Sequence, residues 1–229
     1  MHAHALSALL QLSSPSLPIG GYSYSQGFEA AVDAQLVHDE ASARQWIQQQ
    51  LEQVIAQCEA PIWALLFDGW AQQDWSALSL WNDWFHASRE TREIRQETEQ
   101  MGWSLVKLAT NLDWGDTQAR NYLLGLVVAT LPIAHSYAAH AMGIDKQSGL
   151  AAYLFSWLEN QVMAAIKTVP LGQMAGQRIL NEVRRHIPEV CELAWARAAC
   201  QPPRLHTLSP QFAILSSRHE CQYSRLFRS

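Results

Sequence analysis

Residues 150–167 read LAAYLFSWLENQVMAAIK, and the periodicity of this stretch determines the fold class that we expect. Apolar side chains recur every three to four positions, the period of one helix face. They are Leu150, Leu154, Trp157, Leu158, Val162 and Ile166. The other side carries Ser156, Asn160, Met163 and Lys167. The spacing predicts a long amphipathic helix, which Pro170 must break or kink.

The same period recurs along most of the chain. The expected helices are residues 3–12, a helix from its N-cap Asp39 through Gln57, a new helix from Pro61, a segment capped by Asp74, a charged helix from Arg89 to about Leu112, an apolar helix from Asp116 ending before Pro132, and a short helix from Pro188 to Cys200. No segment shows the alternation of a strand. The sequence therefore predicts an all-α fold.

The length and composition favour one folded unit. The chain has 229 residues, of which 48% are hydrophobic and 16% charged, enough to form a core. We expect a single compact multi-helix domain over residues 1–200, then a linker and C-terminal interaction tail over residues 201–229, stiffened by QPPR at 201–204. Prolines and glycines in residues 15–21 predict an N-terminal loop.

The charge and the cysteine content limit the partners and the cellular compartment that we expect. A net charge of -5 and a pI near 6.0 argue against a nucleic-acid or anionic-membrane surface. Residues 1–6 lack the positive region of a secretory signal, and the four scattered cysteines suit a reducing cytoplasm. The longest apolar run, residues 122–134, is shorter than the roughly 20 residues of a membrane span, so we predict a buried core helix there.

The charged segment from Arg89 to Glu99 places its two signs on different flanks of a helix. The arginines are Arg89, Arg92 and Arg95, and the glutamates are Glu90, Glu93 and Glu97. One interpretation is a solvated face supported by ion pairs between neighbouring turns. The other is an arginine flank that meets an acidic partner.

Catalytic and metal-binding patterns are missing from the sequence. His135 and His140 lie on different helix faces, Glu182 and His186 form only one pair, and His219-x-Cys221 offers two ligands. Neither a nucleophile elbow nor a phosphate-binding loop occurs. We expect no metal site and no cofactor. An interaction scaffold and an all-α enzyme with dispersed catalytic residues both stay open.

Residues 216–229 read SSRHECQYSRLFRS and alternate cations with groups that need burial or a partner. The cations are Arg218, Arg225 and Arg228, and the other groups are Tyr223, Leu226 and Phe227. Such a segment is either a docking peptide or a last helical turn packed on its own domain.

Residues 219–229 resemble the C-terminal signature of the UreF family of urease accessory proteins. Two other stretches support the resemblance: LPIGGYSYSQGFE at 17–29, and VPLGQ at 169–173 with Gly176 and Gln177. Cys221 departs from the family pattern, which more often has a small hydroxyl residue there.

The resemblance implies an all-helical, dimeric scaffold that bridges UreD (UreH) to the GTPase UreG during nickel insertion into the urease apoprotein. The chemistry would then belong to the partners. The family's C-terminal peptide is implicated in partner contacts. Carried over to this chain, the partner-binding residues are Tyr223, Arg225, Leu226, Phe227, Arg228 and Ser229.

Two further groups are candidate partner contacts. Lys167, Gln173 and Gln177 flank the Pro170 break and carry polar groups without an evident partner. Tyr22 and Tyr24 follow the Gly20-Gly21 pair at spacings that cannot all face one way. The tyrosines either pack inward or form a partner-facing loop.

Overall fold

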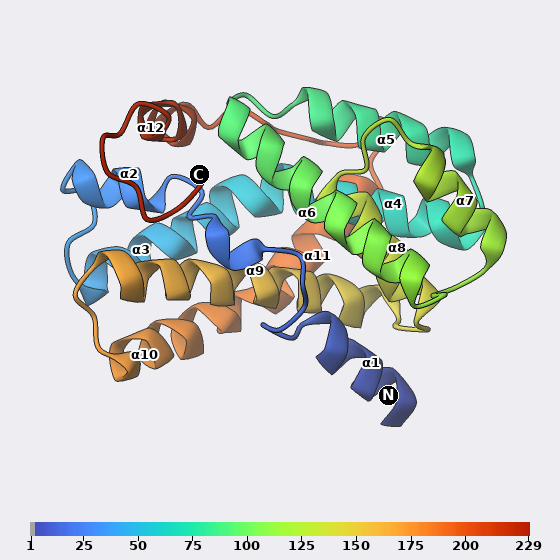
Figure 1. Ribbon diagram of the computed structural model, residues 1–229, viewed down its shortest axis with the longest axis horizontal. Coiled ribbons are helices and arrows are strands. Elements are labelled where there is room, and N and C mark those ends of the chain that lie inside the picture. The colour runs from blue at the N-terminus through green and yellow to red at the C-terminus, as the bar shows by residue number, and fades with distance from the viewer. Residues whose placement is uncertain (1–2) are drawn as a thin grey trace.

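The computed structural model describes residues 3–229, and this part of the chain contains helices, turns and loops but no strand (Figure 1), which confirms the all-α class. The helices are α1 (Ala3–Leu12), α2 (Phe28–Asp33), α3 (Glu40–Gln50), α4 (Ala60–Gln72), α5 (Trp75–Ala87), α6 (Arg92–Asn111), α7 (Thr117–Gly125), α8 (Leu131–Ala141), α9 (Lys146–Thr168), α10 (Gln173–Val183), α11 (Ile187–Ala198) and α12 (Pro210–His219). A π-helix, Leu51–Glu59, joins α3 to α4.

Helix α9 contains the periodic stretch 150–167 and is central to the packing. It contacts α1, α2, α3, α4, α8, α10 and α11, and its apolar residues Leu150, Leu154 and Leu158 are completely buried. Helices α4 and α8 complete the core with Trp63 and Tyr137. The predicted stop is also correct, because α9 ends at Thr168, two residues before Pro170.

The predicted start of a new helix at Pro61 is confirmed to within one residue, because α4 begins at Ala60, but no loop separates α4 from the helix before it. The backbone stays helical from α3 through the π-helix into α4, with Pro61 in the first turn of α4. Pro61 has no N–H, so it cannot donate a hydrogen bond to the Gln57 carbonyl one turn earlier. The His206 N–H donates to that carbonyl at 3.0 Å, so a linker far along the chain satisfies it.

The predicted apolar helix from Asp116 begins as expected, with Asp116 as its N-cap, but its predicted extent to Pro132 is wrong. Helix α7 ends at Gly125, residues 126–130 are extended, and Pro132 lies in the first turn of α8. Asn82 holds the extended segment: its Nδ2 donates to the Val128 carbonyl at 2.8 Å and its Oδ1 accepts from the Thr130 N–H at 3.1 Å. The run 122–134 is therefore not a buried core helix.

The charged helix begins three residues later than predicted. Thr91 caps α6 by accepting from the Ile94 N–H at 3.3 Å, and Arg89 lies in the turn before it. The solvated-face interpretation fails for two of its glutamates, because Glu93 and Glu97 are buried.

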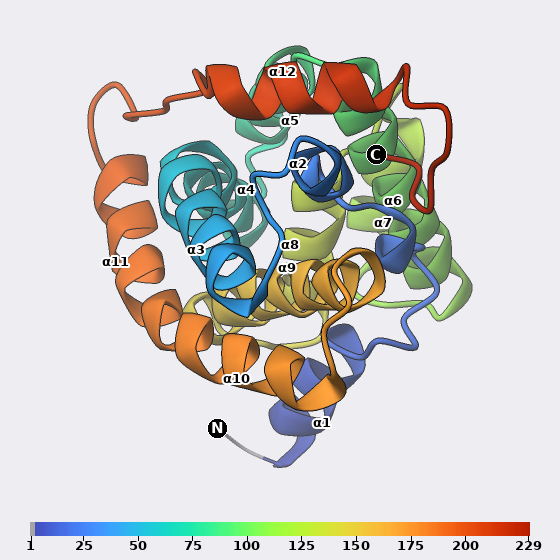
Figure 2. The ribbon, with the colours of Figure 1, turned by 90° about the vertical axis from the view of Figure 1, so that its left-hand side faces the viewer.

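Residues 199–209 cross the molecule to α12, which packs on α2 and α6. Figure 2 shows the segment after α12 turning back towards α2. Within residues 3–229, no helix is long and apolar enough to cross a membrane.

Candidate functional site

The first and last motifs of the sequence meet in space. Ser25 donates to the Ser229 main-chain oxygen through both its N–H (2.7 Å) and its hydroxyl (2.5 Å). The Arg228 N–H donates to the Ser23 carbonyl at 2.8 Å. Residues 220–229, which we call the tail, are thereby fixed to the loop that precedes α2.

Glu29 on α2 is the main anchor of the tail. Its carboxylate accepts from the main-chain N–H groups of Leu226 and Phe227 at 2.8 and 3.1 Å. The side chain is buried, so these hydrogen bonds are shielded from water and each contributes more than at the surface.

His219 lies between two buried carboxylates. Its Nδ1 is 2.7 Å from Glu93 and its Nε2 is 3.1 Å from Glu29, and the ring is completely buried. Both ring nitrogens are thus within hydrogen-bond distance of a carboxylate oxygen. Arg225 adds a cation, 2.8 Å from Glu93. We call Glu29, Glu93 and His219 the carboxylate–histidine cluster.

The tail has one buried and one exposed face. Phe227 and Ser229 are buried in their own chain, with exposures of 6% and 1%. Tyr223 is fully exposed and Leu226 is 69% exposed. The tail thus packs on its own domain and still presents Tyr223, Arg225, Leu226 and Arg228 to the outside.

The other predicted contact residues divide into three groups. Lys167 is exposed and stands over the Phe227 ring, with its Nζ 5.3 Å from the ring centroid. Gln173 and Gln177 are exposed on α10. Tyr24 is buried, and the half-buried Tyr22 donates to Glu159 at 3.0 Å, so both tyrosines pack mainly inward.

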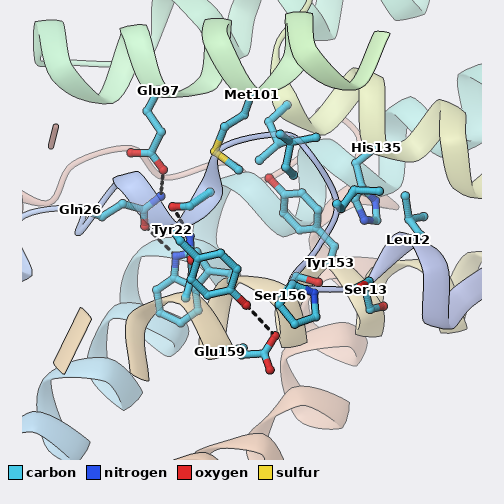
Figure 3. A pocket seen from close by; sticks show the side chains of 18 of the residues that line it. Leu12, Ser13, Tyr22, Gln26, Glu97, Met101, His135, Tyr153, Ser156 and Glu159 are labelled. Atoms are coloured by element: carbon cyan, nitrogen blue, oxygen red, sulfur yellow. Dashed lines mark hydrogen bonds between the residues drawn. The ribbon is translucent and has the colours of Figure 1, made fainter. Parts of the chain in front are cut away.

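A cavity of about 70 Å³ lies beneath the N-terminal loop, between α6, α8 and α9 (Figure 3). Tyr22, Glu97, His135 and Glu159 are among its lining residues. Burial lowers the pKa of His135 to about 3, so this ring is neutral, and its Nδ1 accepts from the Trp63 indole at 3.1 Å. Its Nε2 has no hydrogen-bond partner among the residues described, and a buried water would satisfy it.

Glu97 connects this cavity to the tail. Its two oxygens accept from Gln26 at 2.7 Å and from the Ser229 hydroxyl at 3.0 Å. Burial raises the pKa of Glu97 to about 7, although these two hydrogen bonds oppose the rise.

Over the described range 3–229, no three His, Cys, Asp or Glu side chains are grouped to hold a metal ion. Sequence reasoning missed Glu29, Glu93, Glu97 and His219 as site residues. The available signal was their position: Glu29 and His219 belong to the two end motifs, and Glu93 and Glu97 are one turn apart on α6.

Known proteins resemble this chain over most of its length. The UreF family model matches residues 37–184. A urease accessory protein UreF of Bordetella parapertussis is 58% identical over 220 residues, covering 96% of this chain and all of that protein. The chain belongs to the UreF family of urease accessory proteins.

Two other UreF relatives show the range of chain lengths. A UreF of Cupriavidus metallidurans is 55% identical over 224 residues, which cover 98% of this chain and 97% of that protein. A bifunctional urease accessory protein UreEF of Bordetella bronchiseptica is 58% identical over 229 residues. This chain spans 53% of that bifunctional protein.

Glu97 is expected to make stability depend on pH. Its folded pKa of about 7 exceeds the ordinary 4.5, so its stabilising effect is full below pH 4.5 and is lost as the pH rises through 7. Glu97→Gln should remove a slope of up to about 1.4 kcal/mol per pH unit in this window. Urea unfolding of both proteins between pH 4.5 and 8 measures it. Exposed Glu189→Gln is the control, and parallel curves for wild type and Glu97→Gln would contradict the assignment.

Proposed function

We propose that this UreF-family chain is a non-catalytic scaffold of urease maturation. It bridges UreD (UreH) to the GTPase UreG while nickel is inserted into the urease apoprotein, acts in the cytoplasm, works as a homodimer and influences the GTPase through contact. The observation that carries the proposal is the tail, which is anchored on one face and exposes Tyr223 and Leu226 on the other.

The anchoring favours binding because it fixes the tail before a partner arrives. A free peptide loses main-chain and side-chain freedom when it binds, and this cost reduces affinity. Here Glu29 and Ser25 already hold the main chain at Leu226, Phe227 and Ser229. The exposed Tyr223 and Leu226 therefore form a preformed apolar patch beside Arg225 and Arg228.

Lys167, Gln173 and Gln177 form a proposed second contact. Lys167 borders the tail through Phe227, and the two glutamines lie one turn apart on the exposed side of α10, next to the exposed Met174. A partner that covers the tail and extends along the end of α9 would meet the lysine first.

The alternative of an all-α enzyme could use the cavity beneath the N-terminal loop, where Glu97 has a raised pKa. The cavity of about 70 Å³ suits a few water molecules. Pockets that hold small-molecule substrates are roughly 300 Å³ or larger. The dimensions of this cavity therefore argue against a substrate site around Glu97.

Substitutions on the exposed face of the tail test the proposal. Leu226→Asp and Tyr223→Ala should weaken co-purification with the UreD homologue about tenfold or more, because buried apolar anchors dominate interface energies. Their thermal unfolding should stay unchanged, since both side chains are exposed. Lys167→Ala and Gln173→Ala should also leave thermal unfolding unchanged. They should weaken either the capture of the UreD homologue or the activation of urease in a reconstituted system.

The matched control is Leu80→Asp, an equally exposed leucine on α5. It should leave both the assembly and the melting temperature unchanged. Undiminished capture of the UreD homologue by the tail variants would refute the proposed docking role. Turnover of GTP by the purified chain above a heat-inactivated sample would support an enzyme instead.

A further inference from the structure

A continuous groove runs along the outer face of α6 and reaches the tail at one end, where Arg225, Phe227 and Arg228 line it. It consists of two hollows of about 660 and 550 Å³, whose walls share Glu93, Gln96 and Arg228. Helix α6 forms one side, and α7 with residues 126–129 forms the other at the wider end. We call it the α6 groove.

The wider end of the α6 groove is apolar. Trp103 and Leu124 are more than half exposed, and Val127 is completely exposed at the tip of the extended segment. Large apolar side chains gathered in one concave surface mark interaction sites, whereas single exposed ones need no explanation. These three residues lie along the wall of one hollow.

The unpaired charges of the α6 groove are all positive, apart from the exposed Glu220. Arg92, Lys107 and Arg228 line it and form no salt bridge within residues 3–229; Lys107 instead stands 4.3 Å from the Trp103 ring centroid. The acidic groups on the same wall already have partners: Glu93 lies 2.8 Å from Arg225 and 2.7 Å from His219, and Glu99 lies 2.6 Å from His86. In a chain of net charge -5, this is a local site for an acidic segment.

The dimensions suit a helix. From Arg92 to Lys107, α6 extends about 22 Å, the length of a partner helix of about 15 residues. We propose that the α6 groove binds an amphipathic helix of a partner protein, with its apolar stripe on Trp103, Leu124 and Val127 and its carboxylates facing Arg92, Lys107 and Arg228. This binding mode, an apolar helix face laid in a groove, recurs in protein recognition.

Two other occupants have to be distinguished from a partner helix. A second copy of this chain would make the α6 groove part of a dimer interface, which sedimentation of a groove variant tests. A lipid bilayer requires a protruding apolar face, while Trp103 and Leu124 line a hollow. The proposal also goes beyond the docking role of the tail, because Tyr223 and Leu226 take no part in it.

The test uses the full chain and a designed fluorescent peptide of about 16 residues, with leucines on one helix face and glutamates elsewhere. Its anisotropy should saturate as protein is added. Val127→Asp and Trp103→Ala should weaken binding about tenfold or more, and Arg92→Glu about fivefold. The same peptide with scrambled leucines, or with lysines in place of glutamates, should bind at least about tenfold less tightly.

Matched variants separate the α6 groove from the tail. Leu193→Asp on α11 and Leu226→Asp in the tail should leave peptide binding unchanged. The proposal is overturned if the acidic peptide does not bind, if groove variants bind it normally, or if the scrambled peptide binds equally well. It is equally overturned if Val127→Asp instead abolishes binding to phosphatidylserine vesicles, or converts a dimer to a monomer in sedimentation.

Discussion

Replacing Gly102 with alanine is expected to lower the free energy of unfolding by about 2–3 kcal/mol. An ideal Cβ on Gly102 would lie 2.6 Å from the Thr130 carbonyl carbon and closer still to the Ala129 oxygen. Both obstacles are main-chain atoms, so α6 or the segment 126–130 has to move. Urea unfolding at constant pH measures the loss.

Gly125→Ala is the matched control, because no atom lies within 4 Å of its ideal Cβ. At the end of α7 alanine should be neutral or stabilising by up to about 1 kcal/mol. If Gly102→Ala were as stable as this control, the close approach of α6 and residues 126–130 would be incorrect. A loss for Gly102→Ala alone supports that approach.

Replacing His219 with alanine is expected to destabilise the protein by about 3–5 kcal/mol, since removal of one member of a buried ionic group leaves the others uncompensated. Glu29 and Glu93 would lose their shared partner in a buried site. Urea unfolding reports the loss of stability. Trypsin should also cleave after Arg225 sooner, because the tail is no longer held.

The neighbouring Arg218→Ala is the control for the carboxylate–histidine cluster. Arg218 is exposed on α12, and its removal should change stability by less than about 0.5 kcal/mol. A His219→Ala protein that unfolds like Arg218→Ala and resists trypsin equally would show that His219 does not hold the tail.

The expected effect of His219→Ala depends on residues that lie in different segments of the sequence and that the sequence alone does not connect. The period of the charged helix is compatible with a solvated face or with an arginine flank for an acidic partner, yet Glu93 and Glu97 turn inward and only Arg92 and Arg95 of its arginines are exposed. Arg89 is largely buried, 3.7 Å from Glu59 and stacked on Phe85. Helical period alone cannot tell which polar side chains will find buried partners, because those partners lie on other helices.

In the candidate site, too, the sequence points to some of the residues and only the fold reveals the others. The residues at its surface, Tyr223, Arg225 and Leu226, came from the sequence through the family resemblance. The groups that hold the tail did not, since Glu29 and Phe227 are 198 positions apart and their hydrogen bond leaves no local pattern. Whether Tyr22 and Tyr24 face inward was likewise undecidable until α9 supplied Glu159.

The sequence by itself determined the features that depend on neighbours within one helical turn. Asp39 and Asp74 cap α3 and α5 as predicted, Pro170 follows the end of α9, and the apolar period of residues 150–167 gives the central helix. Each of these follows from hydrogen bonds and side-chain spacing over three to four residues.

Only the tertiary structure decided the features whose hydrogen-bond partners are remote. His206 satisfies the carbonyl that Pro61 leaves open, and the helix therefore continues. Asn82 binds residues 128 and 130, and an apolar run becomes an extended segment. Glu29, Glu93 and His219 join three helices and fold the tail back. A buried polar group must find a partner, and here that partner is supplied by the packed fold rather than by the adjacent residues.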